Sequence, residues 1–523
     1  MALRGERAPN RLGAQMSQSS PPVSDCRIGT GPLGIAEIVA VARKGARVEL
    51  APELHTKLAT ARVAIDRAAA RGDTIYGLTT ALGAAVDTPL DAADLADFQR
   101  RTLRARMVGV GSALSKEATR ALLIARLAGL VPGASGISPA VAQAIADLLN
   151  AGVTPVVPGI GSMGAADLAP LAHAFAVLIG EGEAELKDRV LPGAEALAAA
   201  GLSPVVLGPK DAIALINSNA ASIGPGALVI ADAELSLDAL TSALALSLEA
   251  FRGNTSPIDA RAVALRPTPG LIAIAKRLRE LLAGSDLAKP GAARRVQDPL
   301  SFRSGAPILA ALGDALQQAR SAIELELRGA GDNPAIVDDK GAILSTAGFD
   351  VTHLALTFET LGLALTQAAG ASFWRIVKLM NAPMSGLPRF LTPRGASRTG
   401  FGTVQKTAAS LEAEIRRLAQ PAMFFSGPVA DGIEDIASMA PRVVAKAAEA
   451  FEHITRLAAV ELMVAAQALE LRSPARVAPR ITALKTKIRS VVPTLDEDRP
   501  TGRDVEALAR EIRAGGLAKE VNR

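Results

Sequence analysis

Residue types that build metal clusters, disulfides and stacking surfaces are scarce in this sequence. Its 523 residues include one cysteine, one tyrosine, one tryptophan and four histidines. The single cysteine, Cys26, excludes an internal disulfide and indicates a reducing compartment. One cysteine and four scattered histidines cannot assemble a Cys/His zinc cluster, and no acidic cluster demands a Mg²⁺ ion, so we expect no metal.

An excess of charge of one sign and long uninterrupted apolar runs are also lacking. The 57 basic residues nearly balance the 52 acidic ones, which leaves a net charge of +5. No dense Lys/Arg tract interleaved with aromatic residues is present, which argues against a nucleic-acid partner. No apolar run reaches bilayer length without charges or helix breakers, so we expect a cytoplasmic protein with no membrane span.

The first residues of the chain have the composition of a tail. Residues 1–28 are mostly polar and rich in Arg, Ser and Pro, and they lack the apolar stretch of a secretory signal. Such a composition cannot bury enough apolar surface to order itself. We therefore predict a disordered tail over residues 1–28; a transit peptide is the alternative.

Alanine and leucine at helical spacing are abundant. Apolar residues make up 49% of the chain, and stretches such as "PAVAQAIADLLNAG" repeat them with the period of a helix. Few segments alternate as a half-buried strand would, and the length exceeds one ordinary core. We predict a mainly α fold with a loop-rich N-terminal domain over 29–208 and a bundle of long helices over 209–523.

The lone tyrosine, Tyr76, is placed where a site residue would be. It lies in "IYGLTTALG", a Gly- and Thr-rich stretch too irregular for a helix. A phenol acts as a general base when nearby cations or donors stabilise its anion. A tyrosine that only packs against its neighbours is the alternative.

Several interruptions between the helices form an ordered set. They are "QRRTLRARMVGVG", "GSMGAADLAP", "ALINSN", "VQDPLSFR", "GDNPAIV", "SGLPRFL" and "GIEDIASM". From about residue 30 to residue 480 the chain resembles the histidine and aromatic amino-acid ammonia-lyase superfamily. The resemblance implies an ammonia-lyase/fumarase-like helical bundle, a homotetramer, and active sites that are each built from three subunits.

The loop at residues 161–170 departs from the pattern of that superfamily. There it normally reads Gly-Ala-Ser-Gly-Asp-Leu, and Ala-Ser-Gly cyclises and loses water to form an electrophile, methylidene-imidazolone (MIO). Here Gly164 is followed by Ala165, Ala166 and Asp167, so the serine is absent and the loop is one residue shorter. We expect a degenerate loop that makes no electrophile, and therefore no cofactor.

Other positions match the functional residues of the superfamily. The resemblance implies that Tyr76 is the catalytic base and that Asn217 and Arg303 hold the substrate carboxylate. The planar guanidinium of an arginine suits that role because it donates two hydrogen bonds to one carboxylate. Glu434 matches a glutamate near the amino or ring end of the substrate. An ion pair between helices is the alternative for Arg303 and Glu434.

Further departures concern the walls of the expected site. Leu300 replaces a tyrosine that assists chemistry at the electrophile, and Arg106 replaces a histidine. Lys406 replaces an apolar residue, and Glu434 is its natural partner if it is buried; an outward-facing lysine is the alternative. Phe349 is a candidate wall for a ring or a methylammonium head, or a plain core residue.

Without an electrophile, the chain is either inactive or acts on a substrate that already carries a good leaving group. A trimethylammonium group leaves as neutral trimethylamine. The pattern resembles the ergothionase branch of the superfamily, which lacks MIO and releases trimethylamine from ergothioneine to give thiourocanate. We expect a lyase for a small-molecule betaine of histidine type; a lyase for another betaine, such as histidine betaine, and a non-catalytic homologue are the alternatives.

Overall fold

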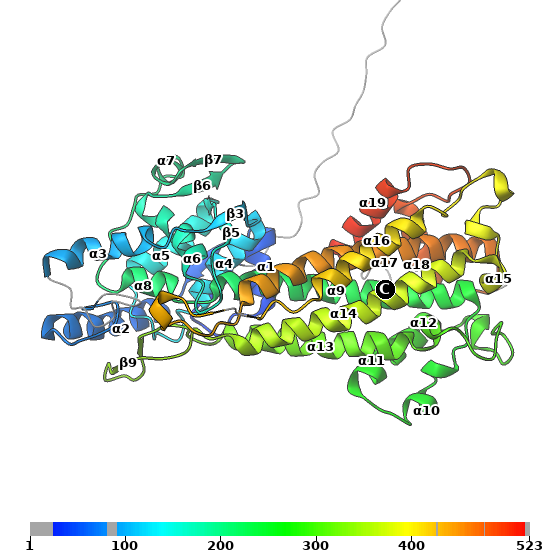
Figure 1. Cartoon of the computed structure of the whole chain (residues 1–523), viewed down its shortest axis with the longest axis horizontal. Coiled ribbons are helices and arrows are strands. Elements are labelled where there is room, and N and C mark those ends of the chain that lie inside the picture. Colours follow the sequence, from blue (N-terminus) through cyan, green and yellow to red (C-terminus); the bar gives the residue numbers. More distant parts are fainter. Residues whose placement is uncertain (1–24, 81–91, 425–426, 475, 518–523) are drawn as a thin grey trace, which may run out of the picture.

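The molecule is elongated, with short helices and strands gathered at one end and long helices filling the rest (Figure 1). The computed structural model describes residues 25–80, 92–424, 427–474 and 476–517. Helices dominate these residues, and the strands are two to four residues long. The predicted mainly α fold is confirmed.

The first part of the chain combines short helices with three small sheets. Its helices are α1 (Ile35–Lys44), α2 (Pro52–Arg71), α3 (Ala92–Arg104), α4 (Lys116–Ala128), α5 (Pro139–Ala151), α6 (Leu168–Ala176), α7 (Gly193–Ala199) and α8 (Asp211–Ile216). Its strands are β1 (Cys26–Ile28), β2 (Val48–Leu50), β3 (Val110–Ala113), β4 (Thr154–Pro155), β5 (Pro158–Ile160), β6 (Glu183–Leu186) and β7 (Arg189–Pro192). β1 and β2 are parallel, whereas the β3–β5 and β4–β6–β7 sheets are antiparallel.

The end of the predicted tail is ordered, which corrects its boundary. Cys26–Ile28 forms β1, and the Cys26 N–H donates to the carbonyl of Arg47 at 2.7 Å. Both Cys26 and Ile28 are buried in the core, because alternate residues of this strand face inward. The remainder of the predicted tail, residues 1–24, lies outside the described residues.

The second part of the chain consists of long helices with short connections. They are α9 (Ala220–Phe251), α10 (Ala260–Val263), α11 (Pro269–Leu281), α12 (Leu300–Arg303), α13 (Gly305–Glu326), α14 (Thr352–Met380), α15 (Ala382–Ser385), α16 (Val404–Leu418), α17 (Ala440–Arg472), α18 (Pro479–Val491) and α19 (Gly502–Arg513). The hairpin of β8 (Ala335–Ile336) and β9 (Ile343–Leu344) joins α13 to α14. α8 packs on α3 and α6, so elements on both sides of the predicted boundary at 208/209 meet there.

The long helix α9 is the axis of the bundle, and it packs against α4, α13 and α17. Its sequence is apolar on all sides, which is typical of a helix buried in a large core. The stretch Asp211–Phe251 is long and apolar enough to cross a membrane, but 94% of its most apolar window is buried inside the protein.

Close contact between α4 and α9 depends on Gly224. A Cβ atom at this position would meet the backbone carbonyl of Ala121 well inside van der Waals distance, and neither backbone is free to move aside.

We expect Gly224→Ala to lower the free energy of unfolding by about 1–3 kcal/mol, measured by denaturant titration. Gly362→Ala, in α14, is the matched control because its Cβ would have its nearest neighbour at 3.9 Å. Equal stability of the two variants would contradict this account of the packing.

Candidate active site

A cavity of about 400 Å³ lies where the first part of the chain meets the long helices. It brings together seven of the nine residues singled out in the sequence. They are Tyr76, Arg106, Ala165, Ala166, Asn217, Phe349 and Glu434. Arg303 and Lys406 are not among the described residues that line it. Leu168, Ile213, Ile433 and Ile436 add an apolar wall.

The loop that carries Ala165 is held from several sides. The carbonyl of Gly164 accepts hydrogen bonds from Asn219 Nδ2 and Ser438 Oγ, both at 3.2 Å. The Ala166 N–H donates to the carbonyl of Phe349 at 3.4 Å. Gly164 has φ of +89°, and a Cβ there would collide with Ser438, so glycine is required. These contacts fix the half-buried Ala165 against the cavity.

The next residue of the loop, Asp167, is a fully buried carboxylate. Its Oδ2 accepts from the backbone N–H of Ser222 at 2.8 Å and from Ser222 Oγ at 3.0 Å. Its Oδ1 accepts from Ser162 Oγ at 3.1 Å. Burial raises the pKa of Asp167 to about 6, although these hydrogen bonds oppose the rise. Asp167 thereby ties the loop to the first turn of α9.

Arg106 is the cation of this cavity among its described lining residues. Burial lowers the pKa of the Arg106 guanidinium, while the negative charges of the Tyr76 phenolate and Glu434 oppose that effect. Its Nη1 donates to the carbonyl of Thr102 at 3.1 Å, the residue one turn back on α3. Arg106 therefore lies close enough to both Tyr76 and Glu434 to stabilise their anionic forms.

A histidine supports the segment that follows Arg106. The Gly109 N–H donates to His173 Nε2 at 3.1 Å. Burial lowers the pKa of His173, so its imidazole is neutral and Nε2 is available as an acceptor. His173 lies on α6, the helix that begins directly after the Ala165 loop. α6 thus links two walls of the cavity.

Asn217 has its amide orientation fixed by a neighbouring loop. Its Nδ2 donates to the carbonyl of Asn333 at 2.8 Å, and Asn333 also lines the cavity. Asn217 Oδ1 is buried and has no hydrogen-bond partner among the described residues. The amide keeps an acceptor and a second N–H for a ligand, which suits the predicted contact with a substrate carboxylate.

Arg303 lies far from the cavity of its own chain. The adjacent Phe302 stacks on Phe251, the last residue of α9, with 4.3 Å between ring centroids. Asn217 and Asn219 immediately precede the first residue of the same helix. At 1.5 Å per residue, the 32 residues of α9 separate the two places by about 48 Å. Arg303 could therefore contact a substrate only in the cavity of another copy of the chain.

Lys406 is also away from the cavity. It is exposed near the beginning of α16, whereas Glu434 follows the other end of α16 in the chain. The expected pairing of Lys406 with Glu434 is not present within one chain. It stays a prediction for an assembly of several chains.

Two lining residues belong to motifs quoted above but were not predicted as site residues. Asp435 follows Glu434 in "GIEDIASM", and Asn333 lies in "GDNPAIV". Periodicity could not reveal their roles, because both lie in loops whose path is set by distant contacts. Both could have been found as the polar residues of those motifs.

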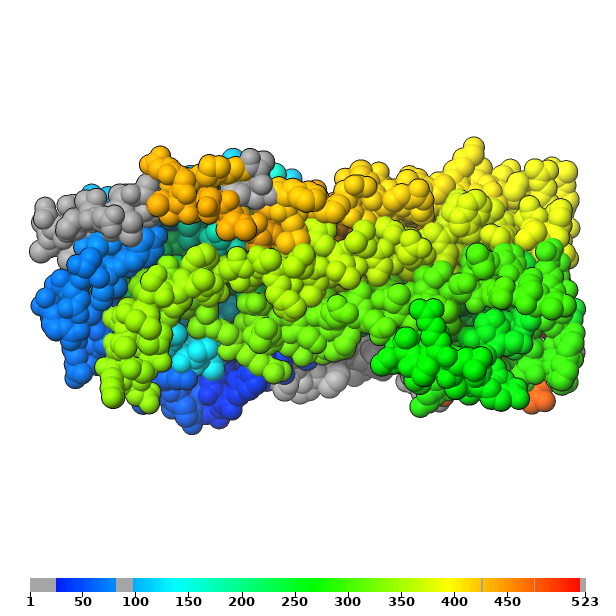
Figure 2. Space-filling view, turned by 60° about the horizontal axis from the view of Figure 1, so that its bottom comes forward, coloured from blue at the N-terminus to red at the C-terminus, as the bar shows by residue number. Residues whose placement is uncertain are grey.

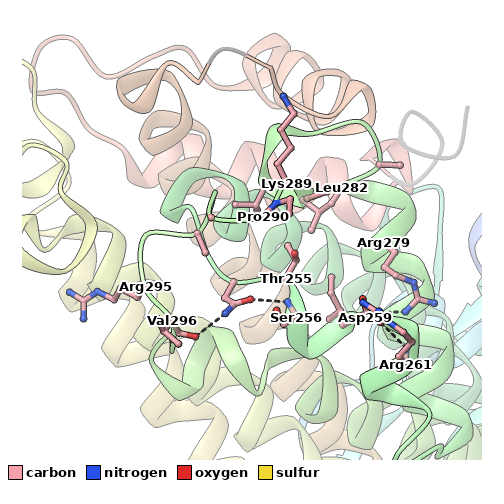
Figure 3. Close-up of a pocket in the computed structure, with 17 residues that line it drawn as sticks. Thr255, Ser256, Asp259, Arg261, Arg279, Leu282, Lys289, Pro290, Arg295 and Val296 are labelled. Carbon is pink, nitrogen blue, oxygen red and sulfur yellow. Dashed lines mark hydrogen bonds and ion pairs between the residues drawn. The ribbon is translucent and has the colours of Figure 1, made fainter.

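A larger cavity, of about 700 Å³, lies at the other end of the molecule and contains none of the predicted site residues (Figure 3). Its Arg261 is paired with Asp259 at 2.9 Å, and Arg279 donates to the carbonyl of Ile258 at 2.6 Å. Lys289 and Arg295 point in different directions and do not converge on one position (Figure 3). Its cations therefore do not form one anion site.

One group of metal-type ligands occurs among the described residues. Ligand atoms of Glu414, Glu449 and His453 lie within 4.8 Å of one another, on α16 and α17. Arg417 forms ion pairs with both glutamates, at 2.7 and 3.3 Å, and so compensates their charge. None of the three lines the cavity of Tyr76.

Known proteins share both the sequence pattern and the fold around this cavity. The family model for aromatic amino acid lyases matches residues 33–490. The chain belongs to the aromatic amino acid lyase family. It is 38% identical to histidine ammonia-lyase of Anaeromyxobacter sp. (strain K) over 497 residues, which cover 93% of this chain and 98% of that relative.

Solved structures agree with this membership. Ergothionase from Treponema denticola, in complex with desmethyl-ergothioneine sulfonic acid, has a TM-score of 0.89 and 31% identity, covering 94% of this chain and 99% of that one. Tyrosine aminomutase from Streptomyces globisporus has a TM-score of 0.90 and 30% identity, covering 95% and 98%. The predicted superfamily is thus confirmed, and the family makes the protein a carbon–nitrogen lyase of small-molecule amino acids.

The elevated pKa of Asp167 makes stability depend on pH. Between the ordinary pKa of 3.8 and about 6, the carboxyl is protonated in the folded protein and ionised in the unfolded one. Folding then takes up a proton, so this contribution to stability falls as pH rises through that window and is constant above it. Asp167→Asn removes the titration and one acceptor. We expect the free energy of unfolding of Asp167→Asn to lie below that of wild type, by a difference that becomes smaller as pH rises from 3.8 to about 6.

Denaturant unfolding at several pH values measures this difference. Asp188→Asn is the control, because the side chain of Asp188 is 97% exposed. If the difference in free energy of unfolding between wild type and Asp167→Asn were the same at all pH values from 3.8 to about 6, the buried carboxyl would titrate outside this range.

Proposed function

We propose that this member of the family is a lyase that works without MIO and releases trimethylamine from a betaine of histidine type, ergothioneine. The observation that carries the proposal is the loop Gly164–Ala165–Ala166–Asp167. MIO formation needs a serine that loses its hydroxyl and a glycine whose nitrogen attacks the preceding alanine carbonyl. Neither residue stands between Gly164 and Asp167, so the loop does not fit that group.

The leaving group decides which substrates remain possible. An unactivated amino group is a poor leaving group, which is why an electrophile is needed to remove it. A quaternary trimethylammonium already carries its positive charge, and it departs as a neutral amine when the C–N bond breaks. The remaining requirement is a base for the adjacent carbon. Tyr76, the lone tyrosine, lines the cavity beside Arg106.

The proposed elimination accounts for every proton and electron pair that moves. The Tyr76 phenolate takes a proton from the β carbon, and the electrons of that C–H bond form the α–β double bond. The C–N bond to the α carbon breaks, and its electron pair leaves with trimethylamine. Arg106 stabilises the phenolate before the transfer, and Asn217 contributes to holding the carboxylate. Glu434 accepts a ring N–H, and the apolar wall with Phe349 borders the methylated head.

The relatives named above point to different substrates. The curated relatives are histidine ammonia-lyases, whereas the solved ergothionase holds a desmethyl-ergothioneine sulfonic acid. The alanine at the loop position favours the betaine, and Lys406 would reach the sulfur only from another copy of the chain. Histidine and sulfur-free histidine betaine are therefore the competing substrates to be compared directly.

The first test compares amines released from ergothioneine, histidine betaine and histidine. We expect trimethylamine from ergothioneine, together with the ultraviolet absorbance of a conjugated product, and no ammonia from histidine. Tyr76→Phe should lower kcat by about 10²- to 10⁴-fold, the usual contribution of a general base. Thr60→Val, which removes an exposed hydroxyl from α2, should retain the wild-type rate. Ammonia release from histidine at a higher rate than trimethylamine release from ergothioneine would overturn the proposal.

We further propose that the active site is completed by other copies in a homotetramer. Arg303 lies about 48 Å from the cavity of its own chain, the length of α9. α14 exposes Leu356, Leu363 and Trp374 by about half each, and their spacing places them on one side of the helix. Figure 2 shows the face along which α13 and α14 run. Such an apolar stripe on a long helix suits a contact between copies.

Mixed assemblies test the shared site. Tyr76→Phe and Arg303→Ala each remove a residue expected to come from a different chain, so each alone should be inactive. Co-expression of the two variants should restore activity, because some sites then receive an intact Tyr76 and an intact Arg303. As the control, the two variants are purified separately and then mixed under conditions in which their subunits do not exchange. Activity no higher than that of either variant would indicate that Arg303 does not act in a neighbour's site.

A further inference from the structure

A fully buried ion pair joins two long helices of the bundle near α12. Arg375 of α14 donates from Nε and Nη2 to the two carboxylate oxygens of Glu461 of α17, at 2.6 and 2.8 Å. The Arg375 side chain is 1% exposed and that of Glu461 is 0% exposed. Removing two charges from water is expensive, and such a pair is often no more stabilising than an apolar one.

The surroundings of Glu461 complete its hydrogen bonding. Ser247 Oγ of α9 donates to Oε1 at 2.8 Å, and Ser372 Oγ of α14 donates to Oε2 at 2.6 Å. Each carboxylate oxygen thus accepts from one arginine nitrogen and one hydroxyl. The arrangement joins α9, α14 and α17 and leaves no acceptor of Glu461 unused.

The remaining nitrogen of Arg375 reaches beyond these three helices. Its Nη1 donates to the carbonyl of Ser301 at 3.0 Å. Ser301 belongs to α12, the helix of four residues whose last residue is Arg303. A helix of one turn has no stability of its own, so its orientation depends on tertiary contacts. The other prominent contact of α12 is the stacking of Phe302 on Phe251.

We propose that Arg375 is a positioning residue that holds α12, and through it Arg303, in the orientation needed to bind a substrate carboxylate. This inference rests on the proposed function of Arg303. Glu461 requires only two of the donors of Arg375, and the third fixes the backbone of the residue two positions before Arg303. A planar guanidinium with divergent donors can serve both partners at once, whereas a lysine cannot fork in this way.

The test removes the tether without leaving a buried charge. In Arg375→Met/Glu461→Gln both charges are removed, so the variant avoids the cost of one unpaired ion. We expect it to fold, with faster amide hydrogen exchange over residues 296–304 than in wild type. Arg43→Gln/Asp232→Asn is the control, because this pair joins α1 to α9 away from α12. Unchanged exchange over 296–304 would overturn the proposal.

A second variant covers the case in which the double variant does not fold. Arg375→Lys keeps a cation beside Glu461 but lacks the fork that reaches Ser301. The same local increase in exchange is expected, and wild-type exchange in a folded Arg375→Lys would equally overturn the proposal. The exchange measurement needs no substrate, so its result stands whether or not ergothioneine is turned over.

Kinetics separates positioning from a general loss of stability. With the substrate that the wild type turns over, the double variant should show a KM raised by about tenfold, the value of one charged hydrogen bond, and little change in kcat. In an Arg303→Lys background, the same substitutions should raise KM much less, because the two changes act through one contact. An equal rise in both backgrounds would show that Arg375 does not act through Arg303. Absence of turnover by the wild type would instead refute the proposed function.

Discussion

The short segment Gly164–Asp167 is the junction on which the cavity depends. Its carbonyl at Gly164 accepts from Asn219, before α9, and from Ser438, before α17. Its Asp167 carboxylate receives the N–H and the hydroxyl of Ser222 at the start of α9. The walls of the cavity are therefore oriented by one set of hydrogen bonds. Burial raises the pKa of this carboxylate, so its ionised form is destabilised in the folded protein.

Alanine at positions 165 and 166 changes what this junction can contribute chemically. Under the proposed function, the loop supplies a small, apolar surface beside Tyr76 and no electrophile. The cavity lining combines small and branched apolar side chains with three charged ones, those of Arg106, Glu434 and Asp435. Such an arrangement can orient a ligand that carries both charges, but it offers no covalent activation. Under the proposed function, the reactivity that an electrophile would supply must therefore come from the leaving group of the substrate.

Much of the fold follows from local sequence, because long periodic helices need little beyond their own pattern and a core to face. Tyr76, Asn217, Phe349 and Glu434, which were singled out from motifs, all line one cavity, while their roles stay predictions. The boundary of the predicted tail was wrong, because β1 gains its order from pairing with β2, a partner 22 residues later in the register. Composition alone cannot reveal such a pairing.

The positions of Arg303 and Lys406 were beyond what local patterns determine. A motif states which residue type is present, but the path of α9 decides how far Arg303 lies from Asn217. Likewise, the pairing of Asp167 with Ser222 joins residues 55 positions apart, and the sequence between them gives no sign of it. Contacts of this range are set by packing of whole helices, which a single sequence does not specify.

The length of the helices is the physical reason why the proposed active site would be divided among chains. A helix of 32 residues separates the residues at its two ends by about 48 Å, far more than any side chain can span. Copies arranged antiparallel would bring the α12 end of one beside the α8 end of another, and a closed symmetric assembly repeats that contact at every site. In such an assembly, rigidity of the bundle core would contribute to catalysis. Any tilt of α12 would be felt at a neighbour's cavity, and a buried, fully hydrogen-bonded arginine next to α12 resists such a tilt.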